Sequence, residues 1–451
     1  MWKFNILKEA ISNKISTDLI IQLVDEFDGI LLFTSGNGNF ESHMNIVGLN
    51  PIIKIYPEHT EFGNQEIAQN NFKIINAIIE ENRVNQFLPI MLGYFSFDFK
   101  SFIEEEGLYL NLDDERFPKS YFSLFEHYLI FDSKFDQIVQ LKLSFPFEFS
   151  SINLDLSKKT IIPETNKQSF YLGTNMNKKQ FCEKVEKVKA YIQQGDIYQV
   201  NLTREINGKT SYSFVEIAKK LYYSNSIEFG VIAKINEKYL ISTSPERFFK
   251  IENNKILTSP IKGTINKTKN KNTNKNQINN LINSQKELSE LAMIVDLLRN
   301  DIGKICTFNS VNVKGFPILK ELENVYHLVA DIEGELSTNS IEEIIKGMFP
   351  GGSISGCPKI RACQIIEELE QKGRGPYTGS FGYFSLNGKM DFNILIRTLF
   401  YHKYSVWFNV GGGITLKSNP LKEYEETIHK ASSIWEAINM EYIHEERYCM
   451  E

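Results

Sequence analysis

Apolar residues recur every three or four positions in two long stretches of the chain, which is the spacing of an amphipathic helix. The first predicted helix spans residues 178–194, and its apolar face consists of Phe181, Val185, Val188 and Ile192. Gly195 follows it, and glycine commonly ends helices. The second helix begins after Ser284, which forms a capping-box pattern with Glu287. Its apolar face consists of Leu288, Leu291, Ile294, Val295 and Leu298.

Shorter apolar runs, such as Ile30–Phe33 and residues 138–143, indicate strands. Residues 379–413 are predicted to form an antiparallel meander, with Asn387-Gly388 as a tight hairpin turn. Asn419-Pro420 opens a last helix, because proline favours the first helical position. Many strands with interspersed long helices predict an α+β fold and not a βαβ repeat.

Polar segments divide this pattern. Residues 265–283 are rich in Asn and Lys, and this composition predicts a solvated, mobile loop, with nucleic-acid contact as the alternative. Polar residues between 150 and 168 mark a predicted boundary between an N-terminal domain, residues 1–165, and a second domain, residues 166–451.

The composition narrows the class of protein. The 451 residues are 42% hydrophobic and 24% charged, as in soluble globular proteins, and a net charge of −6 does not favour a nucleic-acid binder. No apolar run approaches the ~18 residues of a membrane span. The first residues lack a signal-peptide pattern, so we expect a cytoplasmic protein. Five scattered cysteines, at positions 182, 306, 357, 363 and 449, predict reduced thiols and not a disulfide framework or a zinc site.

Two carboxylate pairs are the first candidate chemistry. Glu287 and Glu290 are three residues apart near the start of one predicted helix, and Glu423 and Glu426 have the same spacing in another. This spacing places each pair on one helical face. If the two faces meet, four carboxylates gather, and an all-oxygen site suits Mg²⁺. The alternative for each pair alone is that acidic residues simply favour the first turn of a helix.

Glycine-rich turns are the second. Residues 349–359 (FPGGSISGCPK) lead into a predicted helix that begins near Pro358, and Gly411–Gly413 follow a predicted strand. Backbone amides at a helix start form an anion site when glycines allow close approach. Neither segment contains the Gly-Lys-Ser/Thr of a P-loop, and simple turns are the alternative.

These segments belong to a series of motifs in a fixed order. They are GDIYQVNL (195–202), SPERF (244–248), PIKGT (260–264), MIVDLLRND (293–301), HLV (327–329), residues 349–359, IRT (396–398) and GGG (411–413). In this order they resemble the chorismate-binding domain shared by anthranilate, aminodeoxychorismate, isochorismate and salicylate synthases. The resemblance covers roughly residues 175–440, and it implies large antiparallel sheets in a sandwich-like core flanked by helices.

The resemblance also implies roles for individual residues. Glu287, Glu290, Glu423 and Glu426 match the family's Mg²⁺-holding acids. The predicted chorismate-binding residues are Gln199, Thr264, His327, Ser353, Tyr377, Arg397, Gly412 and Gly413. Arg397 is expected to pair with a substrate carboxylate through its planar fork. Lys359 lies near the glycine-rich loop, where the resemblance implies a contributory role. For His327 and Tyr377 the alternatives are a satisfied core histidine and a packed aromatic ring.

Two positions separate the family's reactions. Water-using members are similar to one another in having a lysine where this chain has Gln199, which cannot accept a proton at neutral pH. Lys262 resembles the nucleophile of the aminodeoxychorismate-forming members, whereas anthranilate-forming members carry alanine there. A neutral Lys262 would attack chorismate, with Glu246 as a candidate general acid or, alternatively, as a structural partner of Arg247.

The sequence therefore favours conversion of chorismate and ammonia to 4-amino-4-deoxychorismate, for 4-aminobenzoate and folate synthesis. The chain has no Gly-x-Cys-x-Gly nucleophile turn, so the resemblance implies a separate glutamine amidotransferase subunit as the source of ammonia. Anthranilate formation is the first alternative, and a non-catalytic chorismate-binding subunit is the second.

Overall fold

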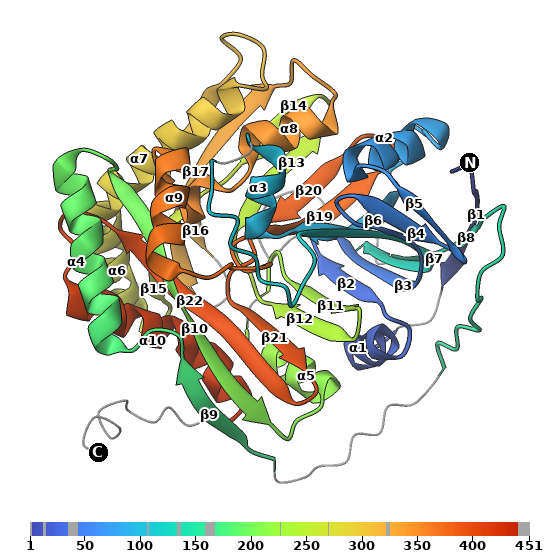
Figure 1. Cartoon of the computed structure of the whole chain (residues 1–451), viewed down its shortest axis with the longest axis horizontal. Helices are drawn as coiled ribbons and strands as arrows, with labels where there is room; N and C mark the ends of the chain where they lie inside the picture. The colour runs from blue at the N-terminus through green and yellow to red at the C-terminus, as the bar shows by residue number, and fades with distance from the viewer. Residues whose placement is uncertain are drawn as a thin grey trace.

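The computed structural model describes residues 2–11, 15–34, 44–105, 108–132, 137–157, 167–225, 227–268, 270–321 and 325–440. The strands of these residues join into one hydrogen-bonded array in which paired strands run antiparallel. Helices flank the array, as Figure 1 shows. The predicted α+β fold with large antiparallel sheets and flanking helices is confirmed.

The strands of the N-terminal third lie together on the side of the molecule that carries the N-terminus (Figure 1). They are β1 (Asn5–Ile11), β2 (Ile30–Phe33), β3 (Met44–Ile55), β4 (His59–Phe62), β5 (Gln65–Ala68), β6 (Pro89–Phe95), β7 (Ser120–Asp132) and β8 (Gln137–Ser144).

The later strands form the rest of the array. They are β9 (Ser169–Thr174), β10 (Gln199–Thr210), β11 (Val231–Ile235), β12 (Lys238–Ser242), β13 (Arg247–Glu252), β14 (Lys255–Thr258), β15 (Ile261–Asn266), β16 (Asn312–Glu321), β17 (Val325–Glu335), β18 (Gly356–Cys357), β19 (Ser380–Ser385), β20 (Met390–Asn393), β21 (Thr398–His402) and β22 (Ser405–Ile414).

The helices of the described residues cover the sheets from outside. They are α1 (Thr17–Glu26), α2 (Asn71–Glu81), α3 (Lys100–Ile103), α4 (Lys178–Gln194), α5 (Phe214–Ser224), α6 (Lys271–Ile282), α7 (Gln285–Gly303), α8 (Ile341–Met348), α9 (Lys359–Glu370) and α10 (Pro420–Ala437), with two short 3₁₀ turns, η1 (Phe97–Phe99) and η2 (Gly352–Ile354).

Side-chain alternation along the strands creates two apolar cores. Ile30 and Leu32 of β2 face the larger core, which lies within the array, whereas Leu31 and Phe33 face a second core. The second core is closed by the apolar faces of α1, α5 and α10. Successive residues of a strand point to opposite faces, so one strand contributes to both cores and fixes the sheet between them.

The predicted helix ends agree with the structure. α4 spans 178–194, and Gly195 ends it in the left-handed conformation, with φ +85°. Ser284 caps α7, and its side chain accepts from the backbone N–H of Glu287. The reciprocal half of the predicted capping box is absent from the contacts of these described residues. The carboxylate of Glu287 is therefore available for other contacts.

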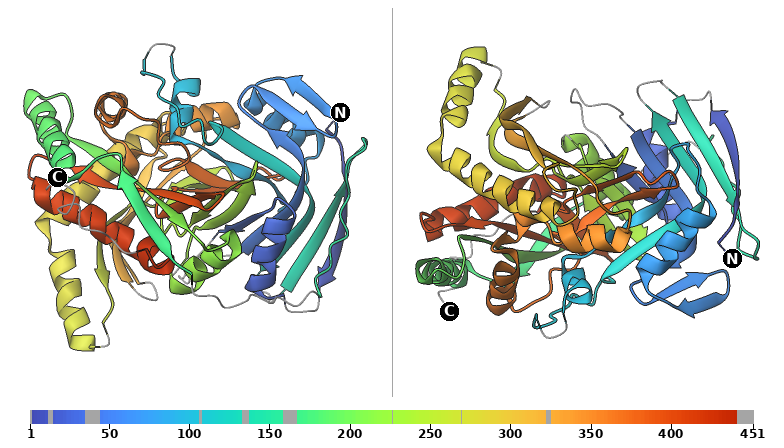
Figure 2. Two further views of the ribbon diagram at one scale, coloured as in Figure 1. Left: turned by 60° about the horizontal axis from the view of Figure 1, so that its bottom comes forward. Right: turned by 90° about the horizontal axis from the view of Figure 1, so that it is seen from above.

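The prediction for residues 265–283 is wrong in its main part, because residues 271–282 form α6. Asn270 caps this helix by accepting from the N–H groups of Asn272 and Thr273, and Leu281 is buried against β15. Both views of Figure 2 show α6 extending from the body of the molecule. A cap and one apolar anchor therefore order a segment whose composition is polar.

The predicted meander is two hairpins. β19 pairs with β20 through the turn at Asn387-Gly388, and β21 pairs with β22, as predicted. β20 and β21 do not pair with each other, because β20 pairs with β13 and β21 with β12. The connecting residues 394–397 thus change partners, and this places Arg397 at a junction between sheets.

Hydrogen bonds cross the predicted domain boundary, which itself lies near residue 165, outside the described residues. β2 pairs with β11, and β6 pairs with β19. The division into residues 1–165 and 166–451 stays a prediction. In the described ranges no helix is long and apolar enough to cross a membrane. The four described cysteines are unpaired thiols, and Cys449 lies outside the described residues.

Replacing Gly195 by alanine is expected to lower the free energy of unfolding by about 1 kcal/mol, because a β-carbon is strained at positive φ. Gly303→Ala is the matched control. An added β-carbon at either position meets no atom within 4 Å, but only Gly195 has the left-handed conformation. Urea denaturation should show a loss for Gly195→Ala alone, and equal stability of the two variants would contradict the explanation.

Candidate active site

Lys262 lies on β15 beside a bulge. The register of β15 against β17 shifts between Lys262 and Thr264, which stands opposite His327. Gly263, between them, has φ +68°, a conformation that glycine adopts readily. A β-carbon added to Gly263 would lie 3.2 Å from Glu287 Oε2. The bulge therefore brings the backbone next to Lys262 against a carboxylate of α7.

The amine of Lys262 makes no hydrogen bond or ion pair with any described residue. The residue is partly buried, and burial lowers the pKa of its amine. The carboxylates of Glu290, Glu246 and Glu287 oppose this effect, while the ammonium of Lys430 adds to it. Lys262 is thus an unpaired amine whose surroundings favour the neutral form more than water does.

Glu246 is buried, with 7% of its surface exposed, and its Oε1 accepts a 2.6 Å hydrogen bond from Ser353 Oγ. Burial raises the pKa of Glu246, against the effects of Ser353 and Lys262. The structural pairing of Glu246 with Arg247 is wrong, because Arg247 binds Asp391 through Nε and Nη2 at 2.9 and 3.1 Å. Glu246 is therefore a carboxyl that holds its proton more tightly than usual, near the lysine.

The two carboxylate pairs are brought together from α7 and α10. Burial raises the pKa of Glu290, and the charges of Glu287, on its own helix, and of Glu423, on the other, raise it further. Burial and the charge of Glu426 raise the pKa of Glu423. A β-carbon added to Gly412 would lie 3.6 Å from a carboxylate oxygen of each α10 glutamate. The predicted convergence of the two helical faces is therefore present.

Two lysines that sequence reasoning missed, Lys430 and Lys286, lie close to these carboxylates. Lys430 Nζ lies 2.7 Å from Glu426 Oε1 and donates to the carbonyl of Gly411 at 2.9 Å. Lys286 lies 3.9 Å from Glu290, and its charge also acts on Glu423. The spacing of Glu426 and Lys430, four residues apart on one helix, was a usable signal.

The acidic cluster fits a hard divalent cation by its chemistry. It offers carboxylate oxygens without nitrogen or sulfur ligands, and Gly412 and Gly263 leave space beside the carboxylates. In the present conformation no three His, Cys, Asp or Glu side chains of the described residues lie close enough together to hold a metal ion. The lysine ammonium groups balance the acidic charge instead, so binding of a cation requires the carboxylates to close around it.

A second group surrounds His327 on β17. Its Nδ1 lies 2.7 Å from Thr264 Oγ1, and its buried Nε2 has no partner among the described residues. Burial and the charges of Arg397 and Lys320 lower the pKa of His327 to about 4, so the ring is neutral. Lys320, which sequence reasoning also missed, stands opposite His327 on β16 and binds the buried Glu228 at 2.7 Å. This group can accept or donate one hydrogen bond beside positive charge.

Arg397 is solvent-exposed and pairs with none of the described carboxylates. Partial loss of hydration lowers the pKa of its guanidinium without an opposing acid. Its backbone has φ +50°, and its carbonyl accepts from Thr243 N–H. An unpaired guanidinium close to a neutral histidine is suited to bind a carboxylate of a ligand.

Gln199 and the glycines of β22 form a further wall. The amide of Gln199 lies over Gly413, where a β-carbon would come within 2.1 Å of its Nε2. The buried Oε1 of Gln199 and Oδ1 of Asn201 have no partner among the described residues. Two unpaired acceptors thus lie on the same side of β10, and a donor-rich ligand would satisfy them.

The remaining predicted residues occupy different surroundings. Tyr377 is buried in the turn between α9 and β19, and burial raises the pKa of its hydroxyl. Lys359 Nζ lies 2.6 Å from the buried Asp301 and donates to the carbonyl of Met348. These contacts fasten the glycine-rich loop to α7, which gives Lys359 a structural part.

The geometry combines an unpaired amine, a protonatable carboxyl, a cluster of four carboxylates and an unpaired guanidinium. An amine and an acid together allow substitution at carbon with protonation of a leaving group. The acidic cluster and the guanidinium suit a substrate with two carboxylates, one bound through a cation and one directly. A small dicarboxylic acid that undergoes substitution is the ligand that this arrangement fits.

Known proteins resemble this chain in sequence and in fold. Residues 30–436 match the family described as chorismate binding enzyme. Anthranilate synthase component 1 of Acetivibrio thermocellus is 30% identical over 447 residues, covering 90% of this chain and 89% of that protein. Aminodeoxychorismate synthase component 1 of Salmonella typhimurium is 37% identical over 262 residues, covering 58% of each.

The fold comparison is equally clear. The crystal structure of anthranilate synthase component I from Streptococcus pneumoniae has a TM-score of 0.72 at 24% identity, covering 88% of this chain and 93% of that chain. The relatives carry the names of two different reactions, so the choice between them rests on individual residues.

Proposed function

Because this chain belongs to the chorismate binding enzymes, we propose that it converts chorismate and ammonia to 4-amino-4-deoxychorismate. The observation that carries the proposal is Lys262, an unpaired, partly buried amine with a lowered pKa beside Glu246. A nucleophilic amine has to be neutral, and burial shifts the pKa of Lys262 in the direction that favours the neutral form. Formation of 4-amino-4-deoxychorismate for 4-aminobenzoate and folate synthesis is the function that such an amine supports.

The proposed reaction has two substitutions. Lys262 Nζ attacks C2 of the chorismate ring, the two ring double bonds shift toward C4, and the bond between C4 and its hydroxyl breaks. Glu246 donates the proton with which that oxygen leaves as water. Ammonia then attacks C4, the two double bonds shift back, and the bond between C2 and Nζ breaks. A proton from the new amine returns to Glu246, so the net reaction exchanges hydroxyl for amine with release of water.

Other residues bind and orient the substrate in this proposal. Arg397 and the neutral His327 bind the enolpyruvyl carboxylate and its oxygens, and Gly412 presents backbone to the ring carboxylate. Glu287, Glu290, Glu423 and Glu426 would hold Mg²⁺, which when bound supplies fixed positive charge for the ring carboxylate. The unpaired Oε1 of Gln199 is a buried acceptor for the N–H groups of ammonia.

Ammonia would come from a separate glutamine amidotransferase subunit. The chain contains no Gly-x-Cys-x-Gly nucleophile turn of its own. Its described cysteines support this view, because burial raises the pKa of Cys306 and Cys363 to about 11 and also raises that of Cys357, away from the reactive thiolate form.

Anthranilate formation is the second candidate, since a relative with that name aligns over 90% of this chain. That reaction eliminates pyruvate after amination and needs no lysine nucleophile. Lys262 is the feature that disfavours it, because an anthranilate-forming site has no use for an amine held beside a carboxyl whose pKa is raised.

Purified protein with chorismate, Mg²⁺ and ammonium is expected to form a non-fluorescent product that aminodeoxychorismate lyase converts to 4-aminobenzoate. The measurement is chromatography of the mixture with and without the lyase. Accumulation of fluorescent anthranilate without lyase would contradict the proposal and favour the second candidate. Chorismate binding without any turnover would instead favour a non-catalytic chorismate-binding subunit.

A further inference from the structure

Arg374 connects three segments of the chain that carry predicted substrate-binding residues. It is buried, with 3% of its surface exposed, in the turn after α9. Its Nη1 donates to the carbonyl of Ile354 and to Thr378 Oγ1, both at 3.2 Å, and its Nη2 donates to the carbonyl of Asn201 at 2.8 Å. Nε and Nη2 also bind Glu370, at 2.8 and 2.6 Å. The five hydrogen bonds match the five N–H donors of a guanidinium.

The acceptors of Arg374 adjoin predicted substrate-binding residues. Ile354 follows Ser353, Thr378 follows Tyr377, and Asn201 lies two residues after Gln199 on β10. Ser353, Tyr377 and Gln199 lie on three segments that are separate in the sequence. A planar, fully used fork therefore sets the separation of the three segments.

Asp98, from the N-terminal third, holds the backbone of Arg374. Its Oδ1 accepts from Arg374 N–H at 3.0 Å, and its Oδ2 accepts from the N–H groups of Gly375 at 2.8 Å and Asp114 at 3.0 Å. The Phe97 ring packs against the guanidinium, and its centre lies 4.6 Å from Arg374 Cζ. The backbone N–H of Phe97 donates to the carbonyl of Gly375. Two elements that are distant in sequence thus fix both ends of Arg374.

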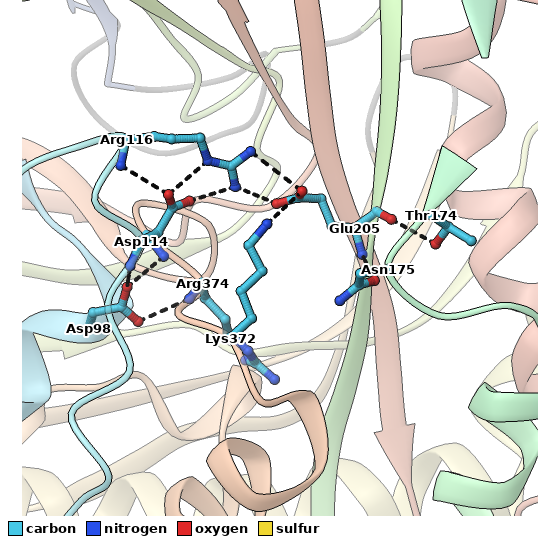
Figure 3. Close-up of polar contacts among 9 residues, drawn as sticks. Asp98, Asp114, Arg116, Thr174, Asn175, Glu205, Lys372 and Arg374 are labelled. Atoms are coloured by element: carbon cyan, nitrogen blue, oxygen red, sulfur yellow. Dashed lines mark hydrogen bonds and ion pairs between the residues drawn. The ribbon is translucent and has the colours of Figure 1, made fainter. Parts of the chain in front are cut away.

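The same network continues toward β10 on the other side of Asp114, as Figure 3 shows. Arg116 binds Asp114 through Nε and Nη2, and it also contacts Glu205, which accepts from Lys372 at 2.7 Å. Arg116 makes no hydrogen bond with the segments that carry Ser353, Tyr377 and Gln199. It offers a matched arginine in the same network.

We propose that Arg374, held in place by Asp98, is a positioning residue that fixes Ser353, Tyr377 and Gln199 around the substrate. The inference rests on the proposed function, because it takes these three residues to line the chorismate site. It adds that the N-terminal third controls the shape of that site through one carboxylate.

Arg374→Lys tests the proposal, since it keeps the charge but has three N–H donors in place of five and no planar fork. The expected result is a Michaelis constant for chorismate raised about tenfold or more in the folded enzyme. Mg²⁺ binding, measured by isothermal titration, should be unchanged, because the carboxylates of α7 and α10 do not contact Arg374. Arg116→Lys should leave the Michaelis constant for chorismate unchanged.

A purely structural role predicts a different result. Arg374→Lys and Arg116→Lys would then lower the denaturation midpoint while the folded fraction keeps the wild-type constant for chorismate, and this would overturn the proposal. If Arg374→Lys does not fold, Asp98→Asn, which keeps the size of the side chain, replaces it. The Michaelis constant of its folded fraction for chorismate is then compared with the wild-type value in the same way. A wild-type protein that binds chorismate without turnover contradicts the proposed function alone, and chorismate titration of the variants then tests the inference.

Discussion

Lys262→Ala is expected to lower the rate of 4-amino-4-deoxychorismate formation by roughly 100-fold or more, because it removes the proposed nucleophile of the first substitution. Lys262→Met removes the amine but keeps most of the side-chain volume, and the same loss is expected. The measurement is the lyase-coupled rate of 4-aminobenzoate formation at saturating chorismate, Mg²⁺ and ammonium. Any residual amination by Lys262→Ala should be examined for anthranilate, since the sequence resemblance implies alanine at this position in anthranilate-forming members.

The covalent step gives this prediction a direct readout. Wild-type protein with chorismate and Mg²⁺ but without ammonium is expected to gain the mass of chorismate less one water. Lys262→Ala should show no such gain, although it should still bind chorismate in isothermal titration. Full amination activity in the variant, or an adduct on another residue, would exclude Lys262 as the nucleophile.

Glu423→Gln is expected to weaken Mg²⁺ binding at least about tenfold and to reduce turnover in proportion at limiting Mg²⁺. Glu423 is buried, and its carboxylate lies beside Gly412, where the proposed function places the ring carboxylate and the cation. The amide keeps the shape of the side chain but not its charge. Isothermal titration with Mg²⁺ alone measures the loss without reference to activity.

Glu425→Gln is the matched control for this change. Glu425 is exposed on the same helix, and its replacement by glutamine removes the same charge. Mg²⁺ affinity should therefore be nearly unchanged in Glu425→Gln. Equal weakening in both variants would indicate a general effect of net charge and would contradict a metal site at the four glutamates.

The sequence predicted the elements whose signals are local. The span of α4, its end at Gly195 and the cap at Ser284 follow from residues within a few positions of one another. The i,i+3 spacing of the glutamates predicted one face on each of two helices. The resemblance then paired the two faces, which periodicity alone left open.

Long-range contacts were beyond a single sequence. The hydrogen bonds of Arg374 reach acceptors up to 173 residues away, and the backbone contacts of Asp98 span up to 277. Nothing in the residues next to Arg374 indicates these partners. For α6, composition predicted a loop, and the burial of Leu281 against β15, a tertiary contact, decided otherwise.

The pairing of β2 with β11 and of β6 with β19 limits how far this chain can be truncated from its N-terminus. A fragment that begins at about residue 166 would leave one edge of β11 and one edge of β19 without a partner strand. The backbone N–H and C=O groups along these edges could then pair with other chains. Such a fragment would also lose the carboxylate that holds the turn of Tyr377. We therefore expect residues 166–451 to need the N-terminal strands for stable folding, and a transplant of these residues onto a foreign partner has to bring those strands along.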